Sequence, residues 1–441
     1  MSEKMGRRQL LKSSLGIATV SGLLRPQISI GAPKAVRLGL VGVGCRGTDL
    51  LETLLDIEGV EIGAIADVDS EHLLRAQNLV ESKRGKRPEG YGKGPEDFRR
   101  LVKRDDLDAV LTATPWKWHT PVCVAAMKAG KYAATEVPAA TTLEECWELV
   151  RTSEETGKPC MMLENVCYFR DALMILNMVR AGEFGELIHC EAGYQHDIRD
   201  VPNGCSGYFD KKGNLLWRGE EAARHNGNIY PTHQLGPVAQ YLNIDRGNRF
   251  TVLVSMSSKA RGFNDWVKHH VGPDHPNAKK EFALGDVNTS LIKTADGCTV
   301  TLYHDTSLPR PYDLIFRVQG TKGLYMKTLD SVYIEGVSPK EHAWETVETY
   351  REKFEHPLWK QLGDVALKYG HGGGDYITLH QFVQAVRNRT QTPQDVYDAA
   401  TWSAISPLSE KSVTGGSVPV EFPDFTKGKW KSRPPVGIVT S

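Results

Sequence analysis

Several features that would narrow the function of a 441-residue chain are missing from this sequence. No window of eighteen apolar residues occurs, so no ordinary membrane-spanning helix is predicted. Lys plus Arg and Asp plus Glu both number 54, so charge gives no reason to expect a nucleic acid or an acidic surface as partner. The eight cysteines include no C-x-x-C pair, which indicates neither a zinc site nor a disulfide framework, and we expect no metal. Repeats and low-complexity linkers are also lacking, which leaves a globular chain long enough for two domains.

The N-terminus resembles a twin-arginine export signal. The pair Arg7-Arg8 precedes a short, weakly apolar stretch at 15–24, and small residues allow cleavage after Gly31. This route carries folded proteins, which suits an enzyme that acquires a nucleotide before export. We therefore predict that residues 1–31 are a signal peptide and that the protein is periplasmic or exported. A basic tail without a targeting role is the alternative.

A glycine-rich turn is the strongest motif in the chain. Gly42-x-Gly44-x-x-Gly47 follows an apolar run at 36–43 and precedes a helical pattern, and this order of strand, turn and helix is typical of dinucleotide binding. Asp67 ends the next apolar run, where a carboxylate accepts hydrogen bonds from ribose hydroxyls and repels a 2′-phosphate. The pattern predicts NAD rather than NADP as cofactor, against the alternative of an ordinary glycine-rich turn.

The periodicity of apolar residues predicts an α/β fold with two domains. Short apolar strands alternate with amphipathic helices in 32–160, as in a Rossmann domain with a doubly wound parallel sheet. In 161–417, runs that alternate apolar and polar residues predict a C-terminal α+β domain with an open, mainly antiparallel sheet. A proline-rich tail, 418–441, follows. The connections at 197–228 and 259–285 are predicted to be long loops.

Several longer motifs resemble the Gfo/Idh/MocA oxidoreductases and, within them, glycoside hydrolase family 109, the NAD-dependent α-N-acetylgalactosaminidases. The resemblance covers residues from about 36 to 430. The longest motif runs from Asn228 to Ala239 and contains Tyr230-Pro231-Thr232-His233. The other motifs are Trp116-Lys117-Trp118-His119, Met162-Leu163-Glu164-Asn165, Gly193-Tyr194-Gln195-His196-Asp197, His304-Asp305-Thr306, Pro309-Arg310-Pro311-Tyr312, Val318-Gln319-Gly320-Thr321-Lys322-Gly323 and Tyr397-Asp398-Ala399-Ala400-Thr401-Trp402.

The resemblance implies two adjoining sets of binding residues. NAD is expected to contact the glycine turn (Gly42, Gly44, Gly47) with Cys45, Arg46, Asp67, Trp116, Lys117, Trp118, His119, Glu136, Val137 and Asn165. A sugar is expected to contact Tyr194, Arg218, Tyr230, Pro231, Thr232, His233 and Tyr312.

One triplet departs from the wider superfamily. Its dehydrogenases usually carry Glu-Lys-Pro, in which the lysine assists oxidation of a hydroxyl, whereas this chain has Glu136-Val137-Pro138. Valine cannot move a proton, so acid–base chemistry must come from other residues. Tyr230 and His233 are three positions apart and share a face if that segment is helical, and histidine titrates near neutrality.

The resemblance implies a retaining glycosidase that releases terminal α-linked N-acetylgalactosamine or a related sugar. The reaction would proceed by transient oxidation at C3, elimination, water addition and re-reduction, with no net redox change, with His233, Tyr230 and Tyr194 as catalytic residues. A NAD-dependent sugar dehydrogenase is the main alternative, and a non-catalytic sugar sensor is another. The expected partner is a small-molecule or glycan substrate, and the superfamily's use of the second sheet implies a homodimer.

Three residues and one glycine-rich run keep two interpretations each. Glu136 is either a catalytic acid or a structural binding residue near the nicotinamide, and Arg46 pairs either with a phosphate or with a surface carboxylate. His233 is either the base or a core histidine. The run His371-Gly372-Gly373-Gly374-Asp375 offers backbone N–H groups to an anion or forms a flexible turn with Asp375 as helix cap.

Overall fold

The computed structural model describes residues 35–200 and 207–436. The predicted signal peptide, the end of the tail and Cys205 lie outside these ranges. The described residues belong to one compact unit that begins at Ala35. The limits of the two domains stay sequence-based predictions.

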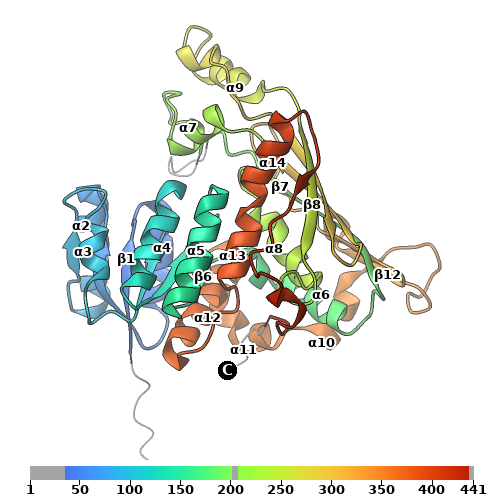
Figure 1. Ribbon diagram of the computed structural model, residues 1–441, viewed down its shortest axis with the longest axis horizontal. Coiled ribbons are helices and arrows are strands. Elements are labelled where there is room, and N and C mark those ends of the chain that lie inside the picture. Colours follow the sequence, from blue (N-terminus) through green and yellow to red (C-terminus); the bar gives the residue numbers. More distant parts are fainter. Residues whose placement is uncertain (1–34, 201–206, 437–441) are drawn as a thin grey trace, which may run out of the picture. The chain divides into compact units, whose positions relative to one another are not determined.

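The N-terminal part contains a six-stranded sheet in the order β3-β2-β1-β4-β5-β6, with every pair parallel (Figure 1). Its central strands are buried along almost their whole length, because helices cover both faces of a parallel sheet. The predicted doubly wound sheet is therefore confirmed, except that β3, with two of its three residues exposed, gives no apolar signal in the sequence. The strands are β1 (Val36–Val41), β2 (Val60–Ala66), β3 (Glu89–Tyr91), β4 (Ala109–Thr112), β5 (Tyr132–Thr135) and β6 (Cys160–Met162).

Helices follow these strands as the sequence pattern predicts. Thr142 and Glu145 form a reciprocal capping box that fixes the start of α5, and the Asp69 side chain caps α2. The helices are α1 (Cys45–Leu55), α2 (Ser70–Arg84), α3 (Phe98–Val102), α4 (His119–Lys128) and α5 (Leu143–Thr156), with a 3₁₀ turn, η1 (Trp116–Trp118), before α4.

The second sheet has nine strands in the order β14-β13-β12-β11-β7-β10-β9-β8-β15. It is antiparallel apart from the pair β7 and β10, so the predicted mainly antiparallel sheet is confirmed. Helices α8 (Thr232–Tyr241) and α14 (Ile405–Thr414) contact its strands β7 and β8, respectively. The strands are β7 (Leu187–Gln195), β8 (Phe250–Ser257), β9 (Val287–Thr294), β10 (Thr299–Asp305), β11 (Arg317–Gly320), β12 (Gly323–Met326), β13 (Ser331–Ile334), β14 (Glu345–Thr346) and β15 (Val420–Glu421).

The later helices join the two sheets. Helix α13 contacts α5, α14 contacts β8, and α12 contacts α1, so a segment late in the chain reaches the glycine turn (Figure 1). Two connections predicted to be loops contain short helices, α7 and α9, so that prediction is wrong there; each helix is too short to give a clear period. The helices are α6 (Arg170–Arg180), α7 (Trp217–Arg224), α8 (Thr232–Tyr241), α9 (Gly262–His270), α10 (Arg351–Phe354), α11 (Pro357–Ala366), α12 (Gly374–Asn388), α13 (Val396–Ser403) and α14 (Ile405–Thr414).

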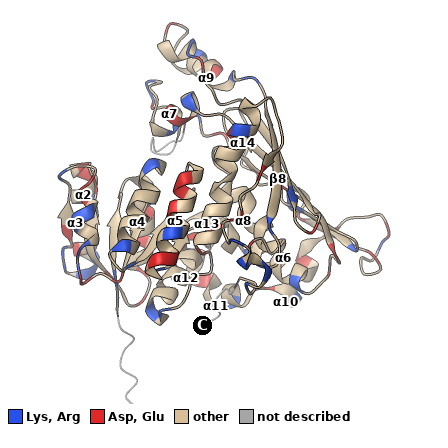
Figure 2. Ribbon diagram, viewed as in Figure 1, with Lys and Arg blue, Asp and Glu red and all other residues tan. Residues whose placement is uncertain are grey.

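Charged residues of both signs are interspersed along the ribbon in Figure 2, in keeping with equal numbers of basic and acidic residues. Among the described residues, no helix combines the length and the apolar character needed to cross a bilayer.

Candidate functional site

The glycine turn lies at the carboxyl edge of the parallel sheet, between β1 and α1. Gly42 has φ +83°, and a Cβ there would lie 2.8 Å from a Thr114 methyl group. At Gly47 a Cβ would lie 2.0 Å from the Gly42 carbonyl oxygen, so helix and strand pack too closely for any side chain. At Gly44, by contrast, a Cβ meets nothing closer than His72 at 3.7 Å. The turn therefore leaves open space beside Gly44, as dinucleotide binding requires.

Asp67 follows β2 and faces the same opening. The backbone N–H of Val43 donates to its Oδ2 at 2.7 Å, and the N–H of Asp69 donates to its Oδ1 at 2.9 Å. These bonds hold the carboxylate beside the glycine turn, where the sequence pattern expects a ribose contact.

A cavity of about 820 Å³ runs along this edge and into the second half of the chain. Its volume falls in the range of small-molecule and cofactor sites. Most of the predicted site residues line it: Gly42, Gly44, Cys45, Arg46, Asp67, Trp116, Lys117, Trp118, His119, Glu136, Val137, Asn165, Tyr194, Arg218, Tyr230 and His233. Four predicted residues are not part of the lining: Gly47, Pro231, Thr232 and Tyr312.

Aromatic side chains form the end of the cavity away from the glycine turn. The rings of Trp116 and Tyr230 stack with centroids 5.5 Å apart, and Trp217 meets Trp116 edge-on at 5.0 Å. The Arg218 guanidinium lies over the Tyr230 ring, 4.8 Å from its centroid. Aromatic faces with one buried cation suit a polar ligand that presents both C–H surfaces and oxygen atoms.

Two tyrosines in this end are poised as hydrogen-bond donors. Burial raises the pKa of Tyr194 to about 12 and raises that of Tyr230 further. Both phenols therefore stay protonated at neutral pH. Their rings lie 5.3 and 5.0 Å from the imidazole of His233, between centroids.

His233, near the start of α8, pairs with a carboxylate that the sequence did not single out. Its Nδ1 lies 2.6 Å from Oε1 of Glu164, whose side chain is fully buried. A carboxylate only accepts, so Nδ1 carries a proton, and Nε2 is the ring nitrogen left to exchange a proton with a ligand. The N–H of Val166 also donates to Glu164 Oε1, at 3.1 Å. This pair orients a histidine as a proton acceptor at the edge of the cavity.

The predicted sugar contacts outside the cavity lining differ in burial. Thr232 is the first residue of α8, directly before His233, and it is fully buried. Tyr312 is 46% exposed, and its ring meets the imidazole of His196 edge-on at 4.8 Å. His196 in turn lies 3.2 Å from the Tyr194 hydroxyl. Tyr312 therefore lies at the rim and not inside the cavity.

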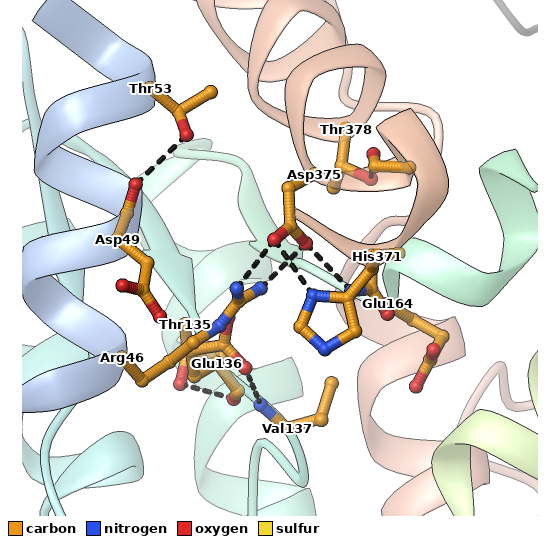
Figure 3. Close-up of polar contacts among 12 residues, drawn as sticks. Arg46, Asp49, Thr53, Thr135, Glu136, Val137, Glu164, His371, Asp375 and Thr378 are labelled. Carbon is orange, nitrogen blue, oxygen red and sulfur yellow. Dashed lines mark hydrogen bonds and ion pairs between the residues drawn. The ribbon is translucent and has the colours of Figure 1, made fainter. Parts of the chain in front are cut away.

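Near the glycine turn, the cavity wall contains a network of charged side chains around Arg46 (Figure 3). Its Nε donates to Glu136 at 2.7 Å, and its two terminal nitrogens donate to Asp375 at 2.6 and 2.8 Å. The guanidinium is thus paired with carboxylates inside the protein. Asp375 does not cap its helix, because no side chain caps the N-terminus of α12.

Comparisons with known proteins agree with this geometry. Residues 168–432 match the family model described as glycosyl hydrolase 109, C-terminal domain. The chain belongs to glycoside hydrolase family 109. Residues 36–164 match the model described as oxidoreductase family, NAD-binding Rossmann fold.

Curated members of family 109 are similar over most of their length. A glycosyl hydrolase family 109 protein of Stenotrophomonas maltophilia is 44% identical, covering 98% of this chain and 98% of that protein. An alpha-N-acetylgalactosaminidase of Tannerella forsythia is 46% identical, covering 91% of this chain and 88% of that protein. One of Shewanella oneidensis is 43% identical, with coverages of 96% and 90%.

Solved structures share the fold of this family 109 chain. A levoglucosan dehydrogenase in complex with NADH has a TM-score of 0.69 at 18% identity and covers 89% of this chain and 100% of its own. A myo-inositol 2-dehydrogenase from Lactobacillus plantarum has a TM-score of 0.62 at 15% identity, with coverages of 88% and 100%.

The cofactor is NAD. The residues present fit it, because the cavity is open beside Gly44 and Asp67 supplies a carboxylate next to the glycine turn. The individual NAD contacts stay predictions.

Three residues of the cavity wall or its support were not among the predicted site residues: Glu164, His196 and Trp217. His371 was expected only to offer the backbone N–H groups of its glycine-rich run, and its side chain was not considered. Glu164 and His196 stand within motifs that carried the resemblance, and Glu164 lies two residues after the buried strand β6. A carboxylate at the end of a buried strand was the available signal. Its partner, His233, is 69 residues further along, and no local pattern connects the two.

Proposed function

We propose that this chain is a NAD-dependent retaining glycosidase acting on terminal α-linked N-acetylgalactosamine. Family membership and the names of the relatives from Tannerella and Shewanella support this substrate. The observation that carries the chemistry is the pair of His233 and Glu164 at the aromatic end of the cavity, 2.6 Å apart.

NAD bound along the glycine turn supplies reversible oxidation at C3 of the sugar, so the reaction has no net redox change. With a ketone at C3, the C2 proton becomes acidic, and His233 Nε2 is the base that accepts it. The bond from C1 to the leaving oxygen then breaks, and Tyr194 or Tyr230 donates a proton to that oxygen. Water then adds to C1 and gives one proton to the tyrosinate left by the previous step, and the imidazolium returns a proton to C2. Each acid or base contributes about 10²–10⁴-fold.

Val137 separates this reaction from ordinary sugar oxidation. Its side chain is buried in the cavity wall, next to Glu136, where it can neither accept nor donate a proton. His233 is therefore the group available for proton transfer, and its removal should stop turnover while NAD stays bound.

A panel of nitrophenyl glycosides tests the proposal directly. The purified protein, with and without added NAD, should release nitrophenol from the α-N-acetylgalactosaminide without NADH accumulating at 340 nm. His233→Ala should lose this activity and keep its NAD. Formation of one NADH per free sugar oxidised would instead identify a dehydrogenase, and full function in His233→Ala would indicate a sugar sensor.

We propose that the outer face of the second sheet joins two copies of the chain. Val252, Met256 and Leu291 are exposed on adjacent strands β8 and β9, where alternate residues face away from the helices. A contiguous apolar surface of this kind favours association. Light scattering should give the mass of a dimer, and Met256→Glu with Leu291→Glu should give a monomer; a monomeric parent protein would contradict the proposal.

We also propose export by the twin-arginine route, on the basis of Arg7-Arg8 and the weakly apolar stretch that follows. Fractionation of expressing cells should place the protein outside the cytoplasm, and replacing both arginines with lysine should retain it inside. Equal distribution of the two forms would contradict the proposal.

A further inference from the structure

The side chain of Arg46 connects three segments that are far apart in the sequence. Each of its three guanidinium nitrogens donates to a carboxylate oxygen, one on Glu136 after β5 and two on Asp375 in α12. Arg46 and Asp375 are 329 residues apart. This charge at the start of α1 therefore anchors α12 against the glycine turn, and it is not the free phosphate ligand that the motif suggests.

Asp375 is the centre of the network. Its side chain is 2% exposed, and besides Arg46 it accepts from Asn165 Nδ2 at 2.7 Å and bonds His371 Nδ1 at 2.8 Å. Burial works against its charge, but the bonds from Arg46 and His371 outweigh burial and hold the pKa of Asp375 well below its usual range. The carboxylate is thus ionised and fixed, and it orients every group that it touches.

His371 is the member of the network that reaches the cavity. Its side chain is half exposed and lines the cavity together with Gly44, Arg46 and Glu136, whereas Asp375 lies behind it. Because Nδ1 bonds Asp375, the second ring nitrogen points away from that carboxylate (Figure 3). His371 also has φ +53°, a left-handed conformation that is uncommon for residues other than glycine and that marks functional positions.

The charged groups around His371 include more carboxylates than cations, which favours positive charge at this position. Asp375 bonds it from α12, Glu136 and Asp49 add negative charge, and Arg46 adds positive charge, while His196 approaches from the end of β7. The hydrogen bond to Asp375 raises the pKa of His371, against burial and Arg46, which lower it. A positive charge on the ring would offset the surplus of carboxylates beside the place where a pyrophosphate would lie.

We infer that His371 is a NAD-contacting residue, supplied from late in the chain, whose Nε2–H donates to a dinucleotide oxygen between the pyrophosphate and the nicotinamide ribose. Gly44, at the pyrophosphate end, and Glu136, at the nicotinamide end, bound this part of the cavity, and His371 lines it with them. The inference depends on NAD as cofactor and not on which bond the protein cuts.

Retention of the cofactor follows from this arrangement. The glycine turn holds NAD from one side and His371 from the other, and the two sides are joined by the paired charges of Arg46 and Asp375. NAD can then leave only when His371 releases it. This suits a cofactor that is returned to its starting state in each turnover and has no reason to exchange.

Release of NAD from the full-length holoprotein tests the inference without any sugar present. His371→Asn keeps a donor near the Nδ1 position and removes Nε2, so the dissociation constant for NAD should rise about tenfold or more, the loss of one hydrogen bond to a charged group. His371→Gln, whose amide reaches the Nε2 position, should recover part of the affinity. His269→Asn, an equivalent change on exposed α9, is the matched control and should change nothing.

The measurement is the rate of NAD loss on dilution, with melting temperatures of the NAD-free proteins to establish that the variants fold equally well. Wild-type retention of NAD in His371→Asn would overturn the inference, including the case in which hydrolysis alone became slower. Asp375→Asn provides a second variant, because it frees both Arg46 and His371 and should release NAD at least as fast as His371→Asn. Loss of NAD retention with hydrolysis of a different sugar would overturn the proposed substrate and leave this inference standing.

Discussion

Replacing Glu164 with glutamine removes a charge from the sugar site without changing its shape. Glu164 Oε1 accepts from both His233 Nδ1 and Val166 N–H, and the amide oxygen of glutamine can keep both bonds. The amide nitrogen then occupies the position of Oε2, which is buried and has no partner among the described residues. The variant therefore isolates the value of the negative charge beside the imidazole.

The charge matters when His233 accepts a proton and becomes a cation. A hydrogen bond to a charged group contributes about 1.5–3 kcal/mol and one between neutral groups about 0.5–1.5 kcal/mol. The loss of charge alone therefore costs about 1–1.5 kcal/mol, and each 1.36 kcal/mol of barrier is about tenfold in rate. Turnover of Glu164→Gln should fall by about 5- to 10-fold, with a smaller change in KM, because the charge acts mainly in the transition state.

The assay is steady-state release of nitrophenol, with NAD content and melting temperature measured on the same preparations. The matched control is Glu281→Gln, because Glu281 is exposed and is not part of the cavity lining; this variant should behave as wild type. Wild-type turnover in Glu164→Gln, or loss of NAD from it, would refute the role assigned to the pair with His233.

Four other substitutions have distinct expected outcomes. Gly44→Ala should keep its melting temperature but lose NAD, because its Cβ meets no atom closer than 3.7 Å yet enters the space of the nucleotide. Gly47→Ala should also lower the melting temperature, because its Cβ would lie 2.0 Å from a carbonyl oxygen. Asp67→Asn should weaken NAD binding about tenfold in a titration. It should also reduce the preference for NAD over NADP, because the carboxylate that repels a 2′-phosphate is lost. Burial, with repulsion from Asp398, raises the pKa of Asp245 to about 7. Between about pH 4 and about pH 7 the folded state therefore holds a proton that the unfolded state releases. The free energy of unfolding should fall as the pH rises through this range. Asp245→Asn should match wild type in denaturant unfolding at pH 4 and exceed it by up to about 4 kcal/mol at pH 8; parallel pH profiles would contradict this.

The Rossmann half and its cofactor were predictable because their signals are local. Gly42, Gly44 and Gly47 occupy one turn, and their spacing follows from how a strand, a turn and a helix pack. Continuous apolar runs likewise predict buried parallel strands. The exceptions are elements that are short and half exposed, such as β3 and α7, in which three to eight residues cannot establish a period.

The polar network was not predictable in this way. The pairs Arg46–Asp375 and Glu164–His233 join residues 329 and 69 positions apart, and they exist only because α12 and α8 fold back onto the carboxyl edge of the first sheet. Arg46 illustrates the difference. Its motif suggests a phosphate contact, but its guanidinium is paired with the carboxylates of Glu136 and Asp375. No rule on sequence spacing predicts these two partners.

The most direct test of the account is hydrolysis of the α-N-acetylgalactosaminide in deuterium oxide, followed by NMR of the released sugar. Because His233, the proposed base, lines the cavity, we expect the proton that it takes from C2 to exchange with solvent before C2 is reprotonated. The product should therefore carry deuterium at C2, keep its anomeric configuration when formed, and leave no NADH behind. Product with protium at C2 and bond cleavage at an unchanged rate would contradict an elimination through C2, and with it the role of the bound NAD.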